Sequence, residues 1–249
     1  MPRYNFRTPR LYLDAPLAPG ATLILDAAQA NYLRNVMRLK AGAAVLVFNG
    51  REGEWAATFT DGGKRAVSLA VGERVRAQTP GLDLYYLFAP LKHARLDYMM
   101  QKAVELGASR LQPVLTRHTQ VARVNLERMK ANAIEAAEQC GILTLPDIAA
   151  PIGFDRMVAE RDRARLLVFC DEDAPVQDPV AALAAARRAG ACPLAVLIGP
   201  EGGFADDERA MLLALPNVLR LALGPRILRA DTAAVAALAL VATVLGDWR

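Results

Sequence analysis

The sequence predicts an α/β protein in two parts, a small β-barrel followed by a larger parallel sheet with helices on both faces. Two observations predict this fold class. In residues 1–75, short apolar runs are separated by glycine turns, which is typical of antiparallel strands. In residues 82–249, apolar runs alternate with helical patterns, and such alternation produces parallel strands joined by helices. The polar, turn-rich residues 76–81 predict a linker between the two parts.

The first part contains four predicted strands and one predicted helix. The strands are residues 22–25, 44–48, 55–59 and 66–71, with glycine turns at 49–50 and 61–63. The helix runs from about residue 26 to residue 39, because Leu33, Val36 and Met37 recur on one face of an α-helix. These elements predict a small barrel that one helix interrupts.

The second part alternates predicted strands with predicted helices. The strands are residues 82–89, 110–115, 166–170, 194–198 and 218–221. The helices are residues 95–106, 126–140, 180–189, 206–215 and 231–245. Ligands of parallel sheets bind beyond the carboxyl ends of the strands. We therefore expect the turns after 194–198 and 218–221 to form two walls of a ligand site, and Asp171 and Glu172, after 166–170, to form the third.

Composition narrows the classes of protein. A hydrophobic content of 53% with 22% charged residues indicates a globular chain. The longest apolar stretch, residues 233–245, is shorter than the roughly 20 residues that a membrane helix needs. Cys140, Cys170 and Cys192 have no paired spacing, which indicates buried thiols in a reducing cytoplasm. Only two histidines occur, outside any metal-ligand motif, so we expect no catalytic metal.

The excess of positive charge lies near the start of the chain. The net charge is +4, and residues 1–75 alone hold 10 Lys and Arg against 6 Asp and Glu, so the remaining residues are balanced. Such a density suits contacts with phosphates, the alternative being an ordinary solvated surface. Two further cations lie near the start of the helix at 95–106, where the helix dipole disfavours positive charge. The candidate RNA-binding residues are Arg3, Arg7, Arg10, Arg34, Arg38, Lys40, Lys92 and Arg95.

Two glycine turns are the main candidates for a ligand site. Residues 198–204 read Ile-Gly-Pro-Glu-Gly-Gly-Phe, and residues 223–229 read Leu-Gly-Pro-Arg-Ile-Leu-Arg. Glycine allows positive φ and a close approach of the backbone to a ligand. The first turn contains Glu201 and no lysine, so it suits a ribose hydroxyl, an amine or a cation better than a pyrophosphate. S-adenosylmethionine, a sulfonium with a ribose, fits this description, and the alternative is two tight connections without a ligand.

The detail of these motifs points to a known family. Residues 199–204 and 224–233 closely resemble the signature of bacterial ribosomal RNA small-subunit methyltransferases of the SPOUT class, which methylate N3 of a uridine in 16S ribosomal RNA. Residues 101–107 (Gln-Lys-Ala-Val-Glu-Leu-Gly), 135–141 (Glu-Ala-Ala-Glu-Gln-Cys-Gly) and 35–40 (Asn-Val-Met-Arg-Leu-Lys) extend the resemblance over effectively the whole chain.

The resemblance implies both an architecture and a cofactor. It implies a PUA-like RNA-binding β-barrel in residues 1–75 and a SPOUT domain with a C-terminal trefoil knot in residues 82–249. It also implies S-adenosylmethionine as cofactor, the small ribosomal subunit and its 16S RNA as partners, and a cytoplasmic homodimer. The expected cofactor-binding residues are Phe169, Ile198, Gly199, Pro200, Glu201, Gly202, Gly203, Leu223, Gly224, Pro225, Ile227 and Leu228.

The implied reaction sets the catalytic candidates. Uracil N3–H must lose its proton before the nitrogen attacks, so we expect a general base and a cation that stabilises the resulting negative charge. Glu201 or Asp231 is the candidate base, and Arg229 and Arg226 are the candidate cations. The alternatives are that Asp231 caps the last helix and that the arginines bind loop carbonyls or the RNA backbone.

Other features leave alternatives open. Glu138 and Gln139 are candidate neighbours of the active site, and we expect Phe204 to pack beneath its turn. The chain departs from the family pattern at Ile142, where relatives tend to have arginine, at Asp231, where they commonly have glutamate, and at Asn31 and Tyr32, where a histidine is frequent. Two rival functions are methylation of another RNA and catalytically silent RNA binding.

Overall fold

The computed structural model describes residues 7–62, 66–175, 178–187 and 192–248, so the candidate RNA-binding Arg3 lies outside the described residues. The chain divides into two compact units. The first unit comprises Met1–Pro80 together with Ala137–Leu145, and the second comprises Gly81–Ala136 and Pro146–Arg249. The sequence does not show that Ala137–Leu145 belongs to the first unit.

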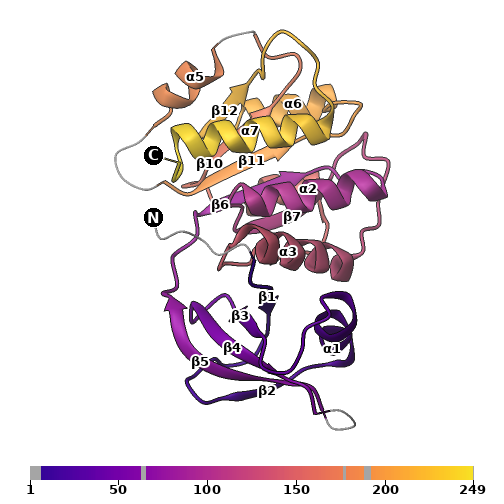
Figure 1. Ribbon diagram of the computed structural model, residues 1–249. Helices are drawn as coiled ribbons and strands as arrows, with labels where there is room; N and C mark the ends of the chain where they lie inside the picture. Colours follow the sequence, from indigo (N-terminus) through magenta and orange to yellow (C-terminus); the bar gives the residue numbers. More distant parts are fainter. Residues whose placement is uncertain (1–6, 63–65, 176–177, 188–191, 249) are drawn as a thin grey trace. The chain divides into compact units, whose positions relative to one another are not determined.

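The first unit is built on one five-stranded sheet (Figure 1). Its strands are β1 (Arg10–Tyr12), β2 (Thr22–Ile24), β3 (Ala44–Phe48), β4 (Glu54–Thr60) and β5 (Ser68–Arg76). Their order is β1-β3-β4-β5-β2, so the sheet is a half-barrel whose ends are β1 and β2, and only the β1–β3 pair is parallel. Strand β1 was not predicted, because three residues are too few to show an alternating pattern. The prediction for β5 needs correction, because this strand continues beyond residue 71 to Arg76, the first residue of the expected linker.

The helix of the first unit changes type along its length. Helix α1 (Ala27–Asn31) begins after Asp26, which forms a reciprocal capping box with Gln29. It continues as a π-helix, η1 (Tyr32–Val36). Because a π-helix has a wider turn than an α-helix, the face expected from 3.6 residues per turn does not persist. Leu33 is buried as predicted, but Val36 and Met37 are exposed.

The second unit contains a parallel sheet, as predicted. Its strands are β6 (Leu84–Phe88), β7 (Arg110–Leu115), β8 (Asp147–Ile148), β9 (Ile152–Gly153), β10 (Leu166–Cys170), β11 (Leu194–Ile198) and β12 (Val218–Leu221). The order is β12-β10-β11-β6-β7-β8, with β9 also paired to β7, and every pairing in it is parallel. The two-residue strands β8 and β9 are too short to be predicted from alternation.

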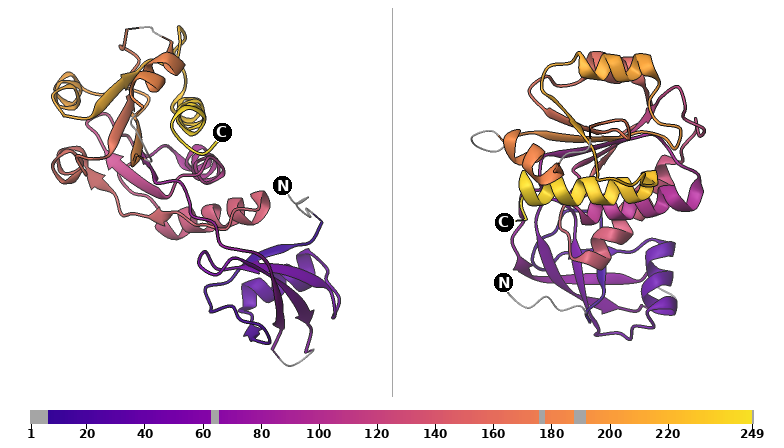
Figure 2. Two further views of the ribbon diagram at one scale, coloured as in Figure 1. Left: turned by 90° about the vertical axis from the view of Figure 1, so that its left-hand side faces the viewer. Right: turned by 90° about the horizontal axis from the view of Figure 1, so that it is seen from above.

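Helices cover both faces of this sheet, which the left view of Figure 2 shows edge-on. They are α2 (His93–Glu105), α3 (Leu126–Cys140), α4 (Phe154–Glu160), α5 (Pro179–Ala185), α6 (Asp206–Leu213) and α7 (Ala230–Val244). Helices α4 and α6 pack on one face through Phe154, Met157 and Leu212, whereas α2 and α7 pack against each other on the opposite face. Helix α4 was not predicted. Among the described residues, no helix is both long and apolar enough to cross a bilayer.

The cysteines differ in exposure, contrary to the expectation that all three are buried. Cys140, at the end of α3, is exposed, whereas Cys170 and Cys192 are half-buried, and all three are free thiols. Burial, followed by the neighbouring Asp171, raises the pKa of the Cys170 thiol to about 12. Because only the thiolate is a strong nucleophile, reactivity should follow exposure and pKa.

We expect iodoacetamide to alkylate Cys140 first and to leave Cys170 unmodified at pH 8. The Cys170 thiol is almost entirely protonated at that pH, whereas a thiol with an ordinary pKa near 8.5 is partly ionised. Peptide mass spectrometry at timed intervals measures the order. Alkylation of Cys170 at the rate of Cys140 in the folded protein would contradict it, and denatured protein provides the control in which all three react.

Candidate active site

The two predicted glycine turns lie at the same edge of the sheet. Strand β11 ends at Ile198 and its turn leads into α6, while β12 ends at Leu221 and its turn leads into α7. Gly203 and Gly224 have φ of 67° and 102°, a conformation that favours glycine. The strand, turn and helix order predicted for both motifs is therefore confirmed, and it places both turns beyond the carboxyl ends of parallel strands.

In the first turn, a glycine makes room for a core aromatic ring. A Cβ atom on Gly199 would lie 3.0 Å from the ring of Phe204. That ring is buried beneath the turn, as predicted, and meets the fully buried Phe169 edge to face, with 6.0 Å between centroids. The ring of Phe169 therefore packs in the hydrophobic core, and the expected contact of this residue with the cofactor stays a prediction.

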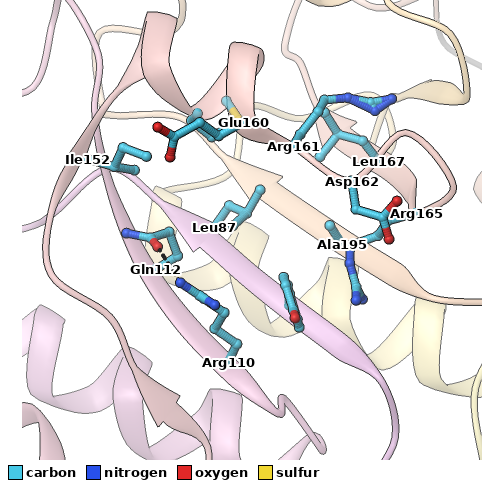
Figure 3. A pocket seen from close by; sticks show the side chains of 12 residues that line it. Leu87, Arg110, Gln112, Ile152, Glu160, Arg161, Asp162, Arg165, Leu167 and Ala195 are labelled. Carbon is cyan, nitrogen blue, oxygen red and sulfur yellow. Dashed lines mark hydrogen bonds between the residues drawn. The ribbon is translucent and has the colours of Figure 1, made fainter.

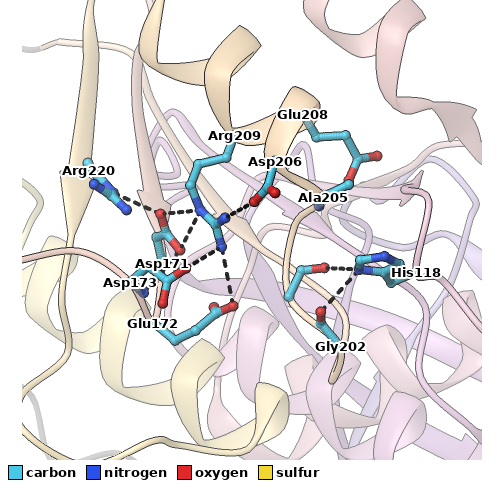
Figure 4. Close-up of polar contacts among 11 residues, drawn as sticks. His118, Asp171, Glu172, Asp173, Gly202, Ala205, Asp206, Glu208, Arg209 and Arg220 are labelled. Atoms are coloured by element: carbon cyan, nitrogen blue, oxygen red, sulfur yellow. Dashed lines mark hydrogen bonds and ion pairs between the residues drawn. The ribbon is translucent and has the colours of Figure 1, made fainter.

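Contacts from two neighbouring loops hold the rest of this turn (Figure 4). The Nδ1 atom of His118, in the loop after β7, lies 3.1 Å from the carbonyl oxygens of both Gly202 and Gly203, so its N–H can donate to them. The carboxylate of Glu208 accepts hydrogen bonds from the backbone N–H groups of Arg117 and Ala205. Sequence reasoning considered His118 only as a metal ligand and missed this positioning role.

The loop after β10 is fixed by arginines. Asp171 is buried, and its Oδ2 lies 3.0 Å from Nε of Arg209 and 2.8 Å from Nε of Arg220. Arg209 also reaches Glu172 at 3.6 Å and Asp173 at 3.0 Å. Asp171, expected to face the ligand, is thus an internal anchor. In its place the carboxylate of Glu172 lies against the first glycine turn.

Gly203→Ala is expected to disturb the site strongly. An added Cβ would lie 2.0 Å from Oε1 of Glu172, and the φ of 67° strains any other residue. We expect a loss of about 1–3 kcal/mol in the free energy of unfolding, measured by urea titration. Gly202→Ala is the matched control, because its φ is not positive and its Cβ would meet only His118, at 3.3 Å. Equal losses in both variants would contradict the prediction.

The second turn is open to solvent. Ile227 is 88% exposed, a Cβ on Gly224 would meet nothing within 4 Å, and Pro225 is also exposed. The candidate cations Arg226 and Arg229 are exposed, and neither guanidinium hydrogen-bonds a loop carbonyl among the described residues. Residue Arg229 is the N-cap of α7, with extended backbone. Both arginines are therefore available to a ligand that approaches this edge.

Three predicted residues meet where the two turns and α2 converge. Nη1 of Arg95, in the first turn of α2, lies 3.7 Å from Oε1 of Glu201, and its Nε lies 4.0 Å from Oδ2 of Asp231. The structure places Arg95 between the two candidate bases, and its expected contact with RNA stays a prediction. Asp231 lies in the first turn of α7, after the N-cap Arg229, so it is not the cap residue.

A tyrosine hydroxyl is buried close enough to Asp231 for that carboxylate to affect its pKa. Tyr86 of β6 is fully buried, and its oxygen has no hydrogen-bond partner among the described residues. Burial, and then the charges of Cys170 and Asp231, hold the pKa of Tyr86 well above its ordinary value. An unpartnered buried hydroxyl is uncommon in a folded protein. An apolar strand pattern conceals such a residue, which sequence reasoning missed.

Glu138 belongs to the first unit. Its Oε1 accepts a hydrogen bond of 2.8 Å from the backbone N–H of Tyr12, and Gln139 beside it is exposed. The expectation that both residues neighbour the active site stays a prediction. The sequence pattern around Glu138 and Gly141 does not show to which unit these residues belong.

Arg10 has a structural role and is corrected as an RNA-binding candidate. It is 6% exposed, its Nε lies 2.6 Å from the buried Glu54, and its guanidinium stacks 4.4 Å from the ring centroid of Phe48. It also donates to the carbonyls of Ala137, Glu138 and Ile142. Its guanidinium is therefore committed to internal contacts.

The other basic candidates remain on the surface. Arg34 pairs with Asp61 at 2.5 Å and is partly exposed. Arg38 has a φ of 54° and is exposed. The further exposed members of the predicted set are Arg7, Lys40 and Lys92.

The fold and site together define a class of protein: a small half-barrel unit joined to an α/β unit with a cluster of charged residues at two glycine turns. Comparison of the sequence with protein families agrees with this two-unit organisation. Residues 78–242 match the family described as RNA methyltransferase domain, and residues 25–71 match the family described as RNA methyltransferase PUA domain. The chain belongs to this family of RNA methyltransferases, which confirms the resemblance seen in the sequence.

Several relatives resemble the chain over nearly its full length. The Ribosomal RNA small subunit methyltransferase E of Rickettsia conorii is 30% identical over 96% of this chain and 95% of its own. The crystal structure of the same-named protein from Neisseria gonorrhoeae, bound to S-adenosylmethionine, has a TM-score of 0.85 with 26% identity and covers 97% of this chain and 100% of its own. A methyltransferase from Legionella pneumophila with the same bound cofactor has a TM-score of 0.78 with 29% identity and covers 95% and 98%.

Proposed function

We propose that this protein transfers a methyl group from S-adenosylmethionine to N3 of a uridine in 16S ribosomal RNA of the small ribosomal subunit. The observation that carries the proposal is the cluster of Arg95, Glu201 and Asp231 beside two glycine turns, at the edge where parallel sheets bind ligands. Family membership and the names of the relatives support it.

The residues of the two turns fit this cofactor. The turn after β12 exposes backbone and an apolar side chain, Ile227, while Glu201 in the other turn offers a carboxylate to a ribose hydroxyl or a sulfonium. When bound, S-adenosylmethionine supplies an electrophilic methyl group. We assign its binding to the residues Ile198, Gly199, Pro200, Glu201, Gly202, Gly203, Leu223, Gly224, Pro225, Ile227 and Leu228.

The charged residues of the site would remove the uracil proton and stabilise the resulting negative charge. A carboxylate, Asp231 or Glu201, accepts the proton of uracil N3–H, and Arg95 between them offsets their mutual repulsion and orients both. The exposed guanidinium groups of Arg229 and Arg226 stabilise the negative charge that then spreads onto the uracil oxygens. We favour Asp231 as the base, because its side chain is 21% exposed and that of Glu201 is 40% exposed.

The family also suggests how the parts are used. We assign RNA binding to the PUA-like unit through Arg7, Arg34, Arg38 and Lys40, with Lys92 in the α/β unit as a further phosphate contact. We place the trefoil knot of the SPOUT class in the C-terminal segment that contains both glycine turns. We also propose a cytoplasmic homodimer, in which a second copy covers the exposed Ile227.

Arg229→Ala is expected to reduce the turnover number about 10²-fold, the effect of removing one donor to a developing negative charge. Cofactor affinity should change little, because the guanidinium is exposed and lies outside the turn backbone. Single-turnover methylation and calorimetric titration of the cofactor measure the two effects. Arg163→Ala, at another exposed arginine, is the control. Unchanged turnover in Arg229→Ala would remove this residue from the mechanism.

The proposed activity is tested by supplying labelled S-adenosylmethionine and small ribosomal subunits that lack the modification. We expect label in 16S RNA, identified by mass spectrometry of nucleosides as N3-methyluridine. If transfer RNA, supplied in parallel, were labelled and 16S RNA were not, the substrate would be another RNA. Binding of RNA without cofactor affinity or label would overturn the enzymatic assignment and leave an RNA-binding module.

A further inference from the structure

The α/β unit has a cavity at the end of the sheet opposite to the glycine turns. Its volume is about 170 Å³, and its lining includes Tyr85 and Arg110, the second residue of β6 and the first residue of β7 (Figure 3). Arg110 pairs with Asp147 at 3.5 Å, and the lining residue Arg165 pairs with Asp83 at 2.7 Å. Because these guanidinium groups are paired within the chain, the cavity does not indicate a ligand. The first glycine turn, at the other end of the sheet, has contacts that bear directly on ligand binding.

The first glycine turn needs contacts from outside itself to keep one conformation. Gly202 and Gly203 are adjacent in it, and glycine has more backbone freedom than any other residue. Fixing such a pair in one conformation therefore costs conformational entropy. Within the turn, the backbone N–H of Gly203 donates to the carbonyl of Pro200 at 3.0 Å. This hydrogen bond leaves the carbonyl groups of both glycines to be held by another part of the chain.

The loop after β7 supplies the missing contact. Nδ1 of His118 lies 3.1 Å from the carbonyl oxygens of both Gly202 and Gly203 (Figure 4). Because both neighbours are acceptors, Nδ1 must carry the hydrogen in the neutral ring, and it also carries one in the protonated ring. The imidazole can therefore hold the two carbonyl groups in either protonation state.

The loop that carries His118 is itself fixed to the residues that follow the turn. The buried carboxylate of Glu208 accepts hydrogen bonds from the backbone N–H groups of Arg117, at 2.8 Å, and Ala205, at 3.0 Å. The guanidinium of Arg117 also pairs with Asp207, in the first turn of α6. The backbone beside His118 is thus fixed next to the glycine turn, so the position of the imidazole is defined.

His118 acts on the turn and not on the charged cluster of Arg95, Glu201 and Asp231. Among the described residues, the hydrogen bonds of its ring go to Gly202 and Gly203. The loop after β7 is joined to α6, on one face of the sheet, whereas Arg95 belongs to α2, on the opposite face. This separation indicates a positioning role rather than a role in proton transfer.

We propose that His118 is a positioning residue that holds the first glycine turn in its cofactor-binding conformation before S-adenosylmethionine binds. The inference rests on the proposed function, which places the cofactor at this turn. A turn that is already ordered does not have to be fixed by the ligand, and such preorganisation raises affinity. Loss of the Nδ1 donor should therefore weaken cofactor binding and leave the binding of RNA and the methyl-transfer step nearly unchanged.

Calorimetric titration of the full chain with S-adenosylmethionine tests the donor. His118→Ala should raise the dissociation constant about five- to tenfold, the effect of losing one hydrogen-bond donor. His118→Asn can place an amide N–H where Nδ1 lies and should restore the affinity to within about twofold, whereas His118→Gln places its amide at the position of Nε2 and should bind as weakly as His118→Ala. Gln120→Ala, at an exposed residue of the same loop, is the matched control and should bind like the wild type.

Amide hydrogen exchange of the free protein tests the conformation of the turn itself. The N–H of Gly203, which donates to Pro200, should exchange about five- to tenfold faster in His118→Ala than in the wild type. The difference should disappear when the cofactor is saturating, because the bound ligand then orders the turn. Steady-state methylation should show a higher KM for the cofactor with kcat within about twofold of the wild type.

The outcomes separate this inference from the proposed function. Wild-type cofactor affinity or wild-type exchange in His118→Ala would overturn the inference, and so would equal affinities of His118→Asn and His118→Gln. An equal loss of cofactor and RNA affinity would show a general structural role and would also overturn it. If His118→Ala fails to fold, the asparagine and glutamine variants still decide the role of Nδ1. Absence of cofactor binding by the wild type would contradict the proposed function itself.

Discussion

Arg10→Met is expected to lower the free energy of unfolding of the first unit by about 3 kcal/mol. Removing one partner of a buried ion pair leaves the other charge without compensation, at a cost of about 3–5 kcal/mol. Glu54 is 1% exposed but keeps a second partner, Arg76 at 3.2 Å, so the lower end of that range applies. The carbonyls of Ala137 and Ile142 also lose their donor. Urea unfolding followed by the fluorescence of Trp55 measures the loss.

Two further variants separate this structural role from an electrostatic one. Lys40→Met removes an exposed charge from the same unit and should change stability by less than about 0.5 kcal/mol. Arg10→Met combined with Glu54→Leu should recover part of the loss, because no unpaired buried carboxylate then remains. If Arg10→Met were as stable as Lys40→Met and bound RNA more weakly, the original assignment of Arg10 to RNA binding would stand.

Asp231→Asn is expected to lower the turnover number about 10²-fold, at the lower end of what loss of a general base costs. Asparagine keeps the size of the side chain and its position in the first turn of α7 but cannot accept the uracil proton. The amide also cannot pair with Arg95 as a charge does. Cofactor affinity should stay within a few-fold, so kcat should fall much more than KM rises. Single-turnover rates with saturating cofactor measure the effect.

Two controls decide which carboxylate acts. Glu201→Gln tests the other candidate and should cost less, since its side chain is more exposed than that of Asp231. Asp206→Asn changes a fully exposed aspartate in the first turn of α6 that pairs with Arg209 and not with Arg95, and should leave turnover unchanged. A larger loss in Glu201→Gln than in Asp231→Asn would assign the base to Glu201. Full activity in both variants would exclude a carboxylate base from this cluster.

Much of the architecture could be predicted from the sequence. The strands that contain five or more described residues were located to within two positions except at the end of β5, because an apolar run bounded by glycine or polar residues has few other ways to be buried. Both glycine turns were recognised, since positive φ at Gly203 and Gly224 restricts the residue type. The three-residue β1 and the helix α4 were missed, because such short elements form only when a neighbouring strand or sheet is present.

The sequence by itself determined the two-part organisation, the parallel sheet, the glycine turns and the family, since each depends on local pattern or on motif order. Only the tertiary structure decided which charged residues serve which purpose. Arg10 is a buried structural residue, Arg95 lies beside the carboxylates of Glu201 and Asp231, and Glu138 belongs to the first unit. The sequence identifies an arginine but not its role, because that role depends on the burial of the guanidinium and on partners that are distant along the chain.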